Sequence, residues 1–315
     1  MPESTNKGHV MARAVKFERY GAIEELKVVD VPTPAAGPGR VVVEVVAAGI
    51  NPGEAKIRTG SLHQLWPATF PSGEGSDFAG RIVEVGEGVS AFAVGDEVLG
   101  FTHERASHAT HVSAPADQVT PKPAGLSWEV AGGLFVAGTT AVGATRALAV
   151  RPGETIVVAG ASGGVGSIAV QLLRRSAALV LGIASERNHE WLRSVGVVPV
   201  AYGEGLADRL RAEAPDGIAG FIDAFGGYLD LALELGVPAA RIDTIVDMAV
   251  AGEYGVLTDG NAAAGTVEVL AELAELAASG ELEIPIAAVY PIDEVQAAYR
   301  ELEQGHTHGK IVLRP

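Results

Sequence analysis

The sequence of 315 residues contains no cysteine. A chain without cysteine forms no disulfide, has no thiolate nucleophile and cannot bind zinc through sulfur. Uninterrupted apolar runs of about 18 residues, the length that spans a membrane, are also lacking. The start of the chain, MPESTNKGHVMARAV, has no apolar core of the kind found in signal peptides. We therefore expect a cytoplasmic protein.

Positive charge and aromatic residues are scarce. The chain has 23 Lys and Arg residues against 39 Asp and Glu, a formal net charge of −16 and 5% aromatic residues. Such a surface repels the phosphates of nucleic acids and of anionic membranes, so we expect neither as a partner. Hydrophobic residues make up 48% of the chain. This length and composition suit a soluble globular protein with one large domain or two ordinary ones.

The stretch Thr155–Gly166, TIVVAGASGGVG, predicts a strand, a glycine turn and a helix. Its glycine spacing is a variant of the dinucleotide-binding fingerprint, with Ala161 where the strict form has its first glycine. Glycines allow a tight turn, the approach of a pyrophosphate and close packing of helix on strand, and the helix N-terminus attracts phosphate. A turn that serves packing alone is the alternative. The predicted cofactor-binding residues of the turn are Gly160, Ser162, Gly163, Gly164, Val165 and Gly166.

After this turn, apolar runs alternate with helix-like stretches. The apolar runs are 179–184, 197–202 and 218–225, and the helix-like stretches are 186–195 and 205–214. This alternation predicts a parallel, doubly wound sheet. Ligands of such sheets bind at the carboxyl ends of the strands, where Asp223, Gly226 and Gly227 lie. We predict cofactor contacts for Phe225 and Gly226, with a bare turn as the alternative for the glycine.

Both ends of the chain have a different pattern. Short β-rich segments with Gly and Pro turns predict strands at 14–17, 26–31 and 41–46. A long helix is predicted at 128–150 and an amphipathic helix at 266–278. The tail predicts strand, helix and strand at 284–290, 293–304 and 310–313. The change of pattern places a domain boundary near residues 125–130.

Several motifs in this order resemble the medium-chain dehydrogenase/reductase superfamily, and most of all its zinc-free quinone oxidoreductase branch, which includes zeta-crystallin-like and alkenal-reductase-like members. They are GINPGEAKIRTG, PSGEGSDFAGRIVEVGEGV, PKPAGLSWEVAGGLFVAGTTA, GASGGVGSIAVQL, ASERN and GKIVL. The resemblance covers residues 12–315. It implies an α/β protein with a GroES-like β domain, residues 1–127 and 282–315, and a Rossmann domain, residues 128–281. It also implies an active site in the cleft between the domains, and a homodimer.

The zinc-binding members of the superfamily have a Cys and an Asp on the loop that matches Ile50–Glu54, and Gly-His-Glu at the positions that match Gly75–Asp77. This chain has Asn51 and Glu54 in the first segment, and Ser76 and Asp77 in the second. A tetrahedral zinc site therefore lacks its ligands. We expect surface or cleft polarity, and no metal, at the neighbouring histidines His103, His108 and His111.

Two residues are predicted to serve catalysis. Asn51 follows an apolar strand in a Gly/Pro loop, where a side chain can project into a cleft; an Asx-type turn before Pro52 is the alternative. By resemblance, Asn51 lies on the substrate side, and Lys56 stands where zeta-crystallin-like members have tyrosine and alkenal-reductase-like members often have lysine. A plain surface charge is the alternative for Lys56.

Thr140 is similar to the threonine that members of the family place near the cofactor, and an ordinary helix hydroxyl is the alternative. Lys310 in GKIVL is predicted to be structural.

NADPH is the predicted cofactor. In NAD-specific folds an acidic residue ends the second strand and binds the ribose hydroxyls, about 20 residues beyond the glycines. Here that strand ends at Ser185, and Arg187 follows. A guanidinium pairs with a phosphate through charge-assisted hydrogen bonds, to which the serine hydroxyl can add another. Glu186 either caps the next helix or binds ribose. In the second case the cofactor is NAD, which is the alternative to NADPH.

The predicted reaction is hydride transfer from the nicotinamide to a quinone or to the C=C of an α,β-unsaturated carbonyl compound. Without zinc, the charge that develops on the substrate oxygen must be met by hydrogen-bond donors. The Asn51 amide is the first candidate and Lys56 the second, and solvent can supply the proton. A catalytically silent NADPH-binding protein, crystallin-like or regulatory, is one alternative. A pathway-specific enoyl reductase is the other.

Overall fold

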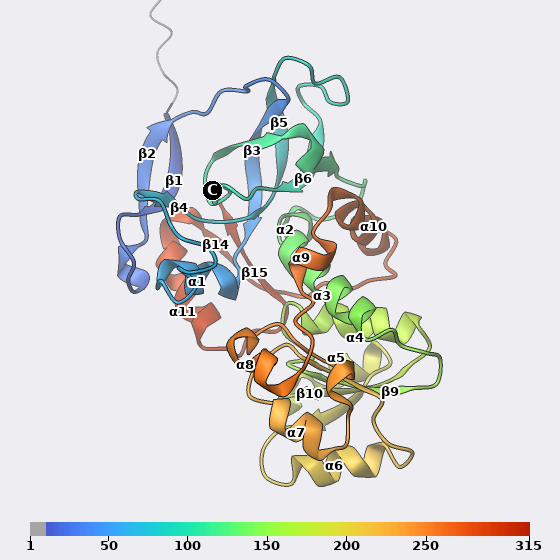
Figure 1. The fold of residues 1–315 in the computed structure, drawn as a ribbon. Coiled ribbons are helices and arrows are strands. Elements are labelled where there is room, and N and C mark those ends of the chain that lie inside the picture. Colours follow the sequence, from blue (N-terminus) through green and yellow to red (C-terminus); the bar gives the residue numbers. More distant parts are fainter. Residues whose placement is uncertain (1–10) are drawn as a thin grey trace, which may run out of the picture.

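The computed structural model describes residues 11–315 and consists of a β-rich part and a parallel α/β part (Figure 1). Residues 1–10, with which the predicted first domain begins, lie outside the described residues. The β-rich part is built from both ends of the chain, and the α/β part from its middle. Among the residues described, no helix combines the length and the apolar character needed to cross a membrane.

The β-rich part contains a small sheet and a larger one. In the small sheet, β1 (Met11–Phe17) pairs antiparallel with β2 (Lys27–Pro32) and β4 (Ser72–Gly73). The larger sheet contains β3 (Arg40–Gly49), β5 (Asp77–Val85), β6 (Glu97–Phe101), β7 (His111–Pro115) and β8 (Val119–Pro121). The short helices here are η1 (Ile23–Glu25), α1 (Pro52–Arg58) and η2 (Ala116–Gln118).

The C-terminal tail completes the larger sheet. Strand β15 (Lys310–Arg314) runs antiparallel to β3, and β14 (Ile286–Pro291) runs parallel to β15. Between them lie η5 (Ile292–Glu294) and α11 (Val295–Glu303). Ile311 and Leu313 share an apolar core with Phe17 at the other end of the chain. The predicted strand, helix and strand of the tail are thus confirmed.

The α/β part is an all-parallel sheet of five strands in the order β11-β10-β9-β12-β13. These are β9 (Thr155–Ala159), β10 (Leu179–Ala184), β11 (Val198–Ala201), β12 (Gly220–Asp223) and β13 (Ile242–Thr244). Ile156 and Val158 belong to one apolar core, and Val157 and Ala159 to another, and all four are completely buried. A strand buried on both faces requires a continuous apolar run, which explains why the sequence predicted it.

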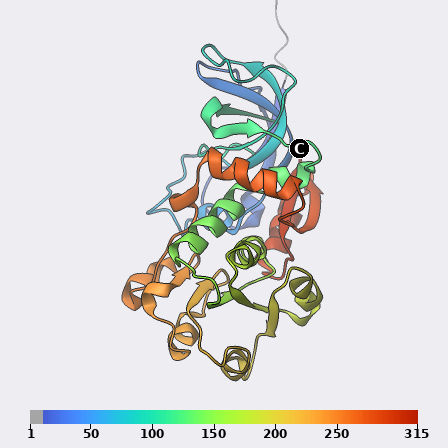
Figure 2. The same ribbon diagram turned by 90° about the vertical axis from the view of Figure 1, so that its right-hand side faces the viewer.

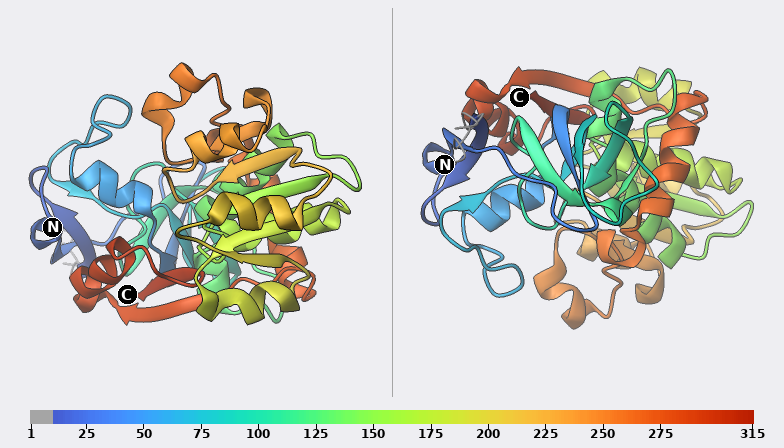
Figure 3. Two further views of the ribbon diagram at one scale, coloured as in Figure 1. Left: turned by 90° about the horizontal axis from the view of Figure 1, so that it is seen from below. Right: turned by 90° about the horizontal axis from the view of Figure 1, so that it is seen from above.

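Helices cover both faces of this sheet (Figures 2 and 3). The helices of this part of the chain are α4 (Gly166–Arg175), η3 (Glu186–Asn188), α5 (His189–Ser194), α6 (Leu206–Glu213), α7 (Leu229–Glu234), η4 (Ala239–Arg241), α8 (Met248–Tyr254), α9 (Asn261–Ala264) and α10 (Val267–Ala278). Of these, α9 packs against α3 (Phe135–Ala147), and α10 against α3 and β8. The doubly wound arrangement is therefore confirmed.

The single helix predicted for residues 128–150 is instead two helices, α2 (Trp128–Gly132) and α3 (Phe135–Ala147). The chain breaks where it packs against β3. A Cβ atom on Gly132 would lie 2.4 Å from the carbonyl oxygen of Ala47, so the backbones approach more closely than a side chain allows. The prediction failed because this contact joins segments distant in sequence.

The two parts also share apolar packing. One core contains Phe101 of β6, Phe135 of α3 and Leu273 of α10, and the two phenylalanine rings stack with centroids 3.7 Å apart. We propose that the domain boundaries lie at residues 127/128 and 281/282. The first falls between β8 and α2, and the second between α10 and β14.

Candidate active site

The glycine turn joins the carboxyl end of β9 to the start of α4. Gly160 has a φ of +69°, in the left-handed region that favours glycine. A Cβ atom on Gly166 would lie 2.1 Å from the carbonyl oxygen of Gly160, so no larger residue fits without moving the backbone. In the first turn of α4 the N–H groups of Ser167, Ile168 and Ala169 donate to carbonyl oxygens of the glycine turn, and the positive end of the helix dipole lies here. The turn therefore has the shape and polarity that a dinucleotide phosphate requires.

The segment after β10 lies beside this turn. Because β9 and β10 are parallel neighbours, Ser185 and Arg187 follow at the same edge of the sheet as the glycines. Asn188 Nδ2 donates a buried hydrogen bond of 2.7 Å to Ser162 Oγ, which ties the segment to the turn. Arg187 is exposed, and its guanidinium donates to the carbonyl oxygen of His306 in the tail. Both residues of the predicted phosphate site are thus close to the glycine turn.

The turn after β12 is organised by the carboxylate of Asp223. Its Oδ1 accepts hydrogen bonds from the backbone N–H groups of Phe225 and Gly226 at 3.1 and 2.7 Å, and its Oδ2 accepts one from Tyr228 at 3.2 Å. Burial raises the pKa of Asp223, and these N–H groups oppose the rise. Phe225 is exposed, and its Cβ lies 3.2 Å from the position of a Cβ atom on Gly160. The structure thus brings the ends of β9 and β12 together.

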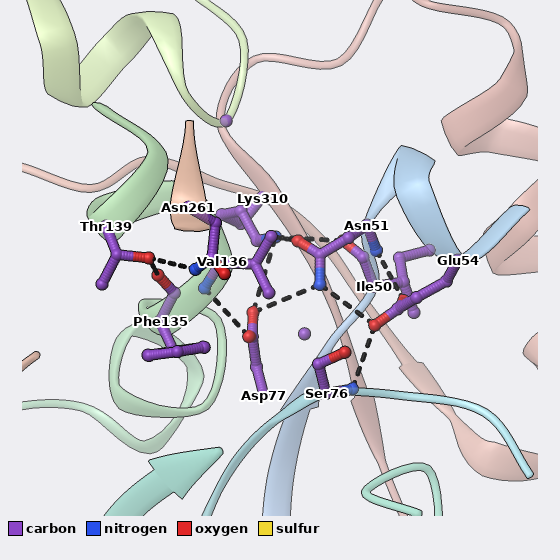
Figure 4. Close-up of polar contacts among 12 residues, drawn as sticks. Ile50, Asn51, Glu54, Ser76, Asp77, Phe135, Val136, Thr139, Asn261 and Lys310 are labelled. Carbon is purple, nitrogen blue, oxygen red and sulfur yellow. Dashed lines mark hydrogen bonds and ion pairs between the residues drawn. The ribbon is translucent and has the colours of Figure 1, made fainter. Parts of the chain in front are cut away.

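Thr140 lies buried in α3, against the segment that precedes α9. Its Cγ2 is 3.7 Å from the position of a Cβ atom on Gly260. The neighbouring Thr139 accepts a hydrogen bond of 2.5 Å from Asn261 Nδ2 and donates one of 2.7 Å to the carbonyl oxygen of Phe135 (Figure 4). A contact between Thr140 and a cofactor remains a prediction.

Asn51 is the centre of a buried polar network (Figure 4). The residue is the N-cap of α1 and is 3% exposed. Its Nδ2 lies 3.2 Å from Glu54 Oε1 and 3.3 Å from Asp77 Oδ2, and its Oδ1 accepts a 2.5 Å hydrogen bond from Lys310 Nζ. Every polar atom of this amide therefore has a protein partner. To donate to a substrate, an N–H of this amide must give up its hydrogen bond to Glu54 or Asp77. The role of Asn51 as a donor stays a prediction.

The sequence predicts a structural role for Lys310, but the structure places this residue in the candidate site. Besides Asn51, its ammonium donates to the carbonyl oxygen of Ile50 at 3.0 Å and lies 3.9 Å from Asp77 Oδ2. Burial lowers the pKa of Lys310, and the nearby carboxylates oppose this. The signal that could have found the residue is its place at the start of β15, whose partner strand β3 leads directly into Asn51.

Asp77, at the start of β5, is completely buried. Its Oδ1 accepts a 3.0 Å hydrogen bond from the backbone N–H of Val136 in α3 (Figure 4). Burial raises the pKa of Asp77 to about 7, although the positive charge of Lys310 acts in the opposite direction. This carboxyl group therefore holds a proton for part of the time at neutral pH.

His108, for which the sequence predicted surface or cleft polarity, does not lie at the surface. The side chain is buried, its Nε2 lies 3.1 Å from the carbonyl oxygen of Gly49, and burial lowers its pKa. The same Nε2 is 3.9 Å from Glu54 Oε2, which accepts a 3.1 Å hydrogen bond from the hydroxyl of Tyr299. Within residues 11–315, no group of three or more His, Cys, Asp or Glu side chains could hold a metal ion.

Lys56 lies in the last turn of α1 and is partly exposed. A cation near the C-terminus of a helix is favoured by the helix dipole. A catalytic role of Lys56 stays a prediction, with a plain surface charge as the alternative.

Two family models match the chain. The alcohol dehydrogenase GroES-like domain matches residues 37–158, and the zinc-binding dehydrogenase model matches residues 215–313. The quinone oxidoreductase of Rattus norvegicus is 37% identical over 183 residues, which are 58% of this chain and 55% of that protein. The NADPH-dependent alkenal/one oxidoreductase of Arabidopsis thaliana is 27% identical and covers 96% of this chain and 79% of its own length.

A solved structure agrees over nearly the whole length of both chains. The Escherichia coli quinone oxidoreductase complexed with NADPH has a TM-score of 0.85 and 25% identity, and it covers 96% of this chain and 100% of its own. The family-model match and this agreement show that the chain has a GroES-like domain with a Rossmann domain. Together with the family models and the relatives, this agreement shows that the chain belongs to the medium-chain dehydrogenase/reductase superfamily.

Proposed function

We propose that the protein is an NADPH-dependent oxidoreductase that reduces quinones or the C=C of α,β-unsaturated carbonyl compounds without zinc. The observation that carries the proposal is that the glycine turn lies next to the Asn51 network. The backbone N–H of Gly309 donates to the carbonyl oxygen of Ser162 in the turn at 2.9 Å, and the next residue, Lys310, bonds to Asn51. The names of the relatives, quinone oxidoreductase and alkenal/one oxidoreductase, support the same activity.

The residues present fit a nicotinamide dinucleotide. A Cβ atom on Gly160 would meet Phe225, and one on Gly166 would meet the carbonyl oxygen of Gly160, so the turn keeps its shape only with glycine at both positions. We propose that the turn residues hold the diphosphate, that Ser185 and Arg187 hold the phosphate on the adenosine ribose, and that Thr140, Phe225 and Gly226 lie toward the nicotinamide. Arg187 would exchange the carbonyl of His306 for that phosphate. When bound, NADPH supplies a hydride.

The chain itself must stabilise negative charge on the substrate and provide a proton. Hydrogen-bond donors aimed at a developing oxyanion are worth several kcal/mol in a closed site. We propose Asn51 and Lys56 for this task. Asp77, which the sequence did not single out for catalysis, is a further group that carries a proton near neutral pH. Solvent is the other source of the proton.

The charges around Asn51 support independence of zinc. The positions that match zinc ligands hold Asn51, Glu54 and Asp77, which bond to one another or to Lys310. The ammonium of Lys310 already supplies positive charge to these carboxylates. A second cation at this place would be repelled by the first.

The experiment is to follow the absorbance of NADPH with a panel of quinones, enones, alkenals and enoyl thioesters, with and without a chelator. Oxidation of NADPH by a quinone or an enone, unaffected by the chelator, supports the proposal. Loss of activity to the chelator, restored by zinc, would overturn zinc independence. Turnover with enoyl thioesters alone would favour the pathway-specific enoyl reductase. Binding of NADPH without any turnover would favour the silent NADPH-binding protein.

We also propose that the protein is a cytoplasmic homodimer with a small-molecule substrate. Membership of the superfamily supports the dimer, and the net charge of −16 makes nucleic acids and anionic membranes unfavourable partners. Light scattering coupled to size exclusion gives the mass in solution, and a monomeric mass would contradict the dimer.

A further inference from the structure

Lys310 lies across the glycine turn. The residue before it, Gly309, forms a short parallel bridge with Gly163, and its backbone N–H donates to the carbonyl oxygen of Ser162 at 2.9 Å. The Cδ of Lys310 is 3.1 Å from the position of a Cβ atom on Gly164. The aliphatic part of the lysine therefore packs directly on the predicted cofactor-binding backbone.

The other end of the same side chain is bound to the substrate side. Its ammonium donates to Ile50 O at 3.0 Å and to Asn51 Oδ1 at 2.5 Å, and it is 3.9 Å from Asp77 Oδ2 (Figure 4). The residue is 4% exposed. A buried ammonium that loses its partners is strongly unfavourable. The charge therefore keeps these contacts while the stem rests on the turn.

The orientation of the Asn51 amide depends on this ammonium. With Oδ1 held by Lys310, Nδ2 is directed at the carboxylates of Glu54 and Asp77. A shift of the lysine stem, caused by a ligand on the glycine turn, must move the amide or break its shortest hydrogen bond. One side chain thus connects the two halves of the candidate site.

We propose that Lys310 is a positioning residue that couples occupancy of the glycine turn to the orientation of the Asn51 amide, so that cofactor and acceptor strengthen each other's binding. The proposal rests on the proposed function, because it requires a cofactor at the turn and an acceptor beside Asn51. Coupling of this kind is reciprocal, so either ligand reports it.

The test measures the affinity of the whole protein for NADP⁺, with and without saturating 1,4-naphthoquinone, by titration calorimetry. These two oxidised compounds do not react with each other, and the chain has no cysteine for the quinone to alkylate. For the wild type, the quinone is expected to tighten NADP⁺ binding by about five-fold or more. The quantity compared is the ratio of the NADP⁺ dissociation constants without and with the quinone. In Lys310→Met, which keeps the stem and loses the charge, this ratio should fall to about one.

The matched control is Lys122→Met. Lys122 is also a buried lysine, paired with Glu97 at 3.4 Å and lying over the ring of Trp128, away from the glycine turn and Asn51. This variant is expected to keep the wild-type ratio. Damage to the structure alone lowers the affinities for NADP⁺ and for the quinone, but it leaves the effect of the quinone on NADP⁺ binding unchanged. The ratio therefore separates a positioning role from a loss of stability.

A second variant keeps the charge and moves the stem. In Gly164→Ala the new methyl group would lie 3.1 Å from Lys310 Cδ, close enough to displace it slightly. The ratio should fall here too, which keeps the test decisive if Lys310→Met does not fold. A ratio of one in the wild type, or a wild-type ratio in the variants, overturns the coupling alone. Failure of the wild type to bind NADP⁺ and NADPH would instead overturn the proposed function.

Discussion

Asn51 and Lys310 are 259 positions apart in the sequence and are joined by a buried hydrogen bond of 2.5 Å from Nζ to Oδ1. The contact exists because β15 returns to pair with the end of β3. The substrate side of the candidate site is therefore completed by the last residues of the chain.

Gly166→Ala should damage both the fold and the cofactor site. The new methyl group would lie 2.1 Å from the carbonyl oxygen of Gly160, so the turn must move. Overpacking of this kind costs about 1–3 kcal/mol in the free energy of unfolding. Chemical denaturation and NADPH titration measure the two effects. In the control Gly252→Ala, a Cβ atom meets nothing within 4 Å. Wild-type stability and NADPH affinity in Gly166→Ala would show that the turn tolerates a side chain.

Arg187→Ala should weaken NADPH binding by about 10- to 100-fold, or about 1.5–3 kcal/mol, because a charge-assisted contact with the phosphate is lost. Affinity for NADH, which lacks that phosphate, should not change. Fluorescence titration with both cofactors measures this. Arg193, exposed on the following helix, provides the control Arg193→Ala. An unchanged NADPH affinity, or an equal loss for both cofactors, would mean that Arg187 does not bind the phosphate.

Asn51→Ala should lower kcat/KM for the acceptor while leaving NADPH affinity nearly intact. The substitution removes a candidate donor to the substrate and frees Lys310 and Asp77 from their shared partner. Steady-state kinetics and direct NADPH titration separate the two quantities, and thermal unfolding shows whether the variant folds. Full activity would establish Asn51 as a turn residue only.

Asp77 should make stability depend on pH. Its pKa is raised from an ordinary value of 3.8 to about 7, so the folded state binds a proton that the unfolded state releases. The stability contributed by Asp77 is complete below its ordinary pKa and is lost as pH rises through about 7, at up to about 1.4 kcal/mol per pH unit. Asp77→Asn does not titrate. The wild type should therefore lose stability relative to this variant between about pH 5 and about pH 7.

Denaturant unfolding of both proteins across this range provides the measurement. Asp243, whose pKa is also raised to about 7 by burial, is present in both proteins and cancels in the difference. If the difference in the free energy of unfolding between the wild type and Asp77→Asn does not vary with pH, Asp77 is not protonated in the folded state near neutrality.

The sequence predicted those strands, turns and helices that can be recognised from the pattern of their own residues. Strand β9 is one continuous apolar run because both of its faces are buried. In the turn that follows, Gly160 is favoured by its left-handed backbone and Gly166 by a close backbone contact. The motif order was enough to predict the GroES-like and Rossmann folds, which the comparisons support. Local pattern and motif order therefore sufficed for the architecture.

Features that depend on distant contacts could not be predicted. The break between α2 and α3 follows from the approach of Gly132 to Ala47, and α1 lies within a segment that had the composition of a loop. Lys310 and His108 have buried partners on other elements, which no local pattern records. The sequence singled out Asn51 and the glycine turn as site residues, which stay predictions, but it did not single out Lys310 in the tail that joins them.

Reduction of a conjugated C=C bond or of a quinone can be followed with an isotope label. NADPH with deuterium at one or the other C4 position reacts with a simple enone, and the product is analysed by mass spectrometry and NMR. The expected product is a saturated carbonyl compound with one deuterium at the β-carbon, from one of the two labelled cofactors. Deuterium at the carbonyl carbon of an allylic alcohol, or no product with quinones and enones although NADPH binds, would contradict the proposed function.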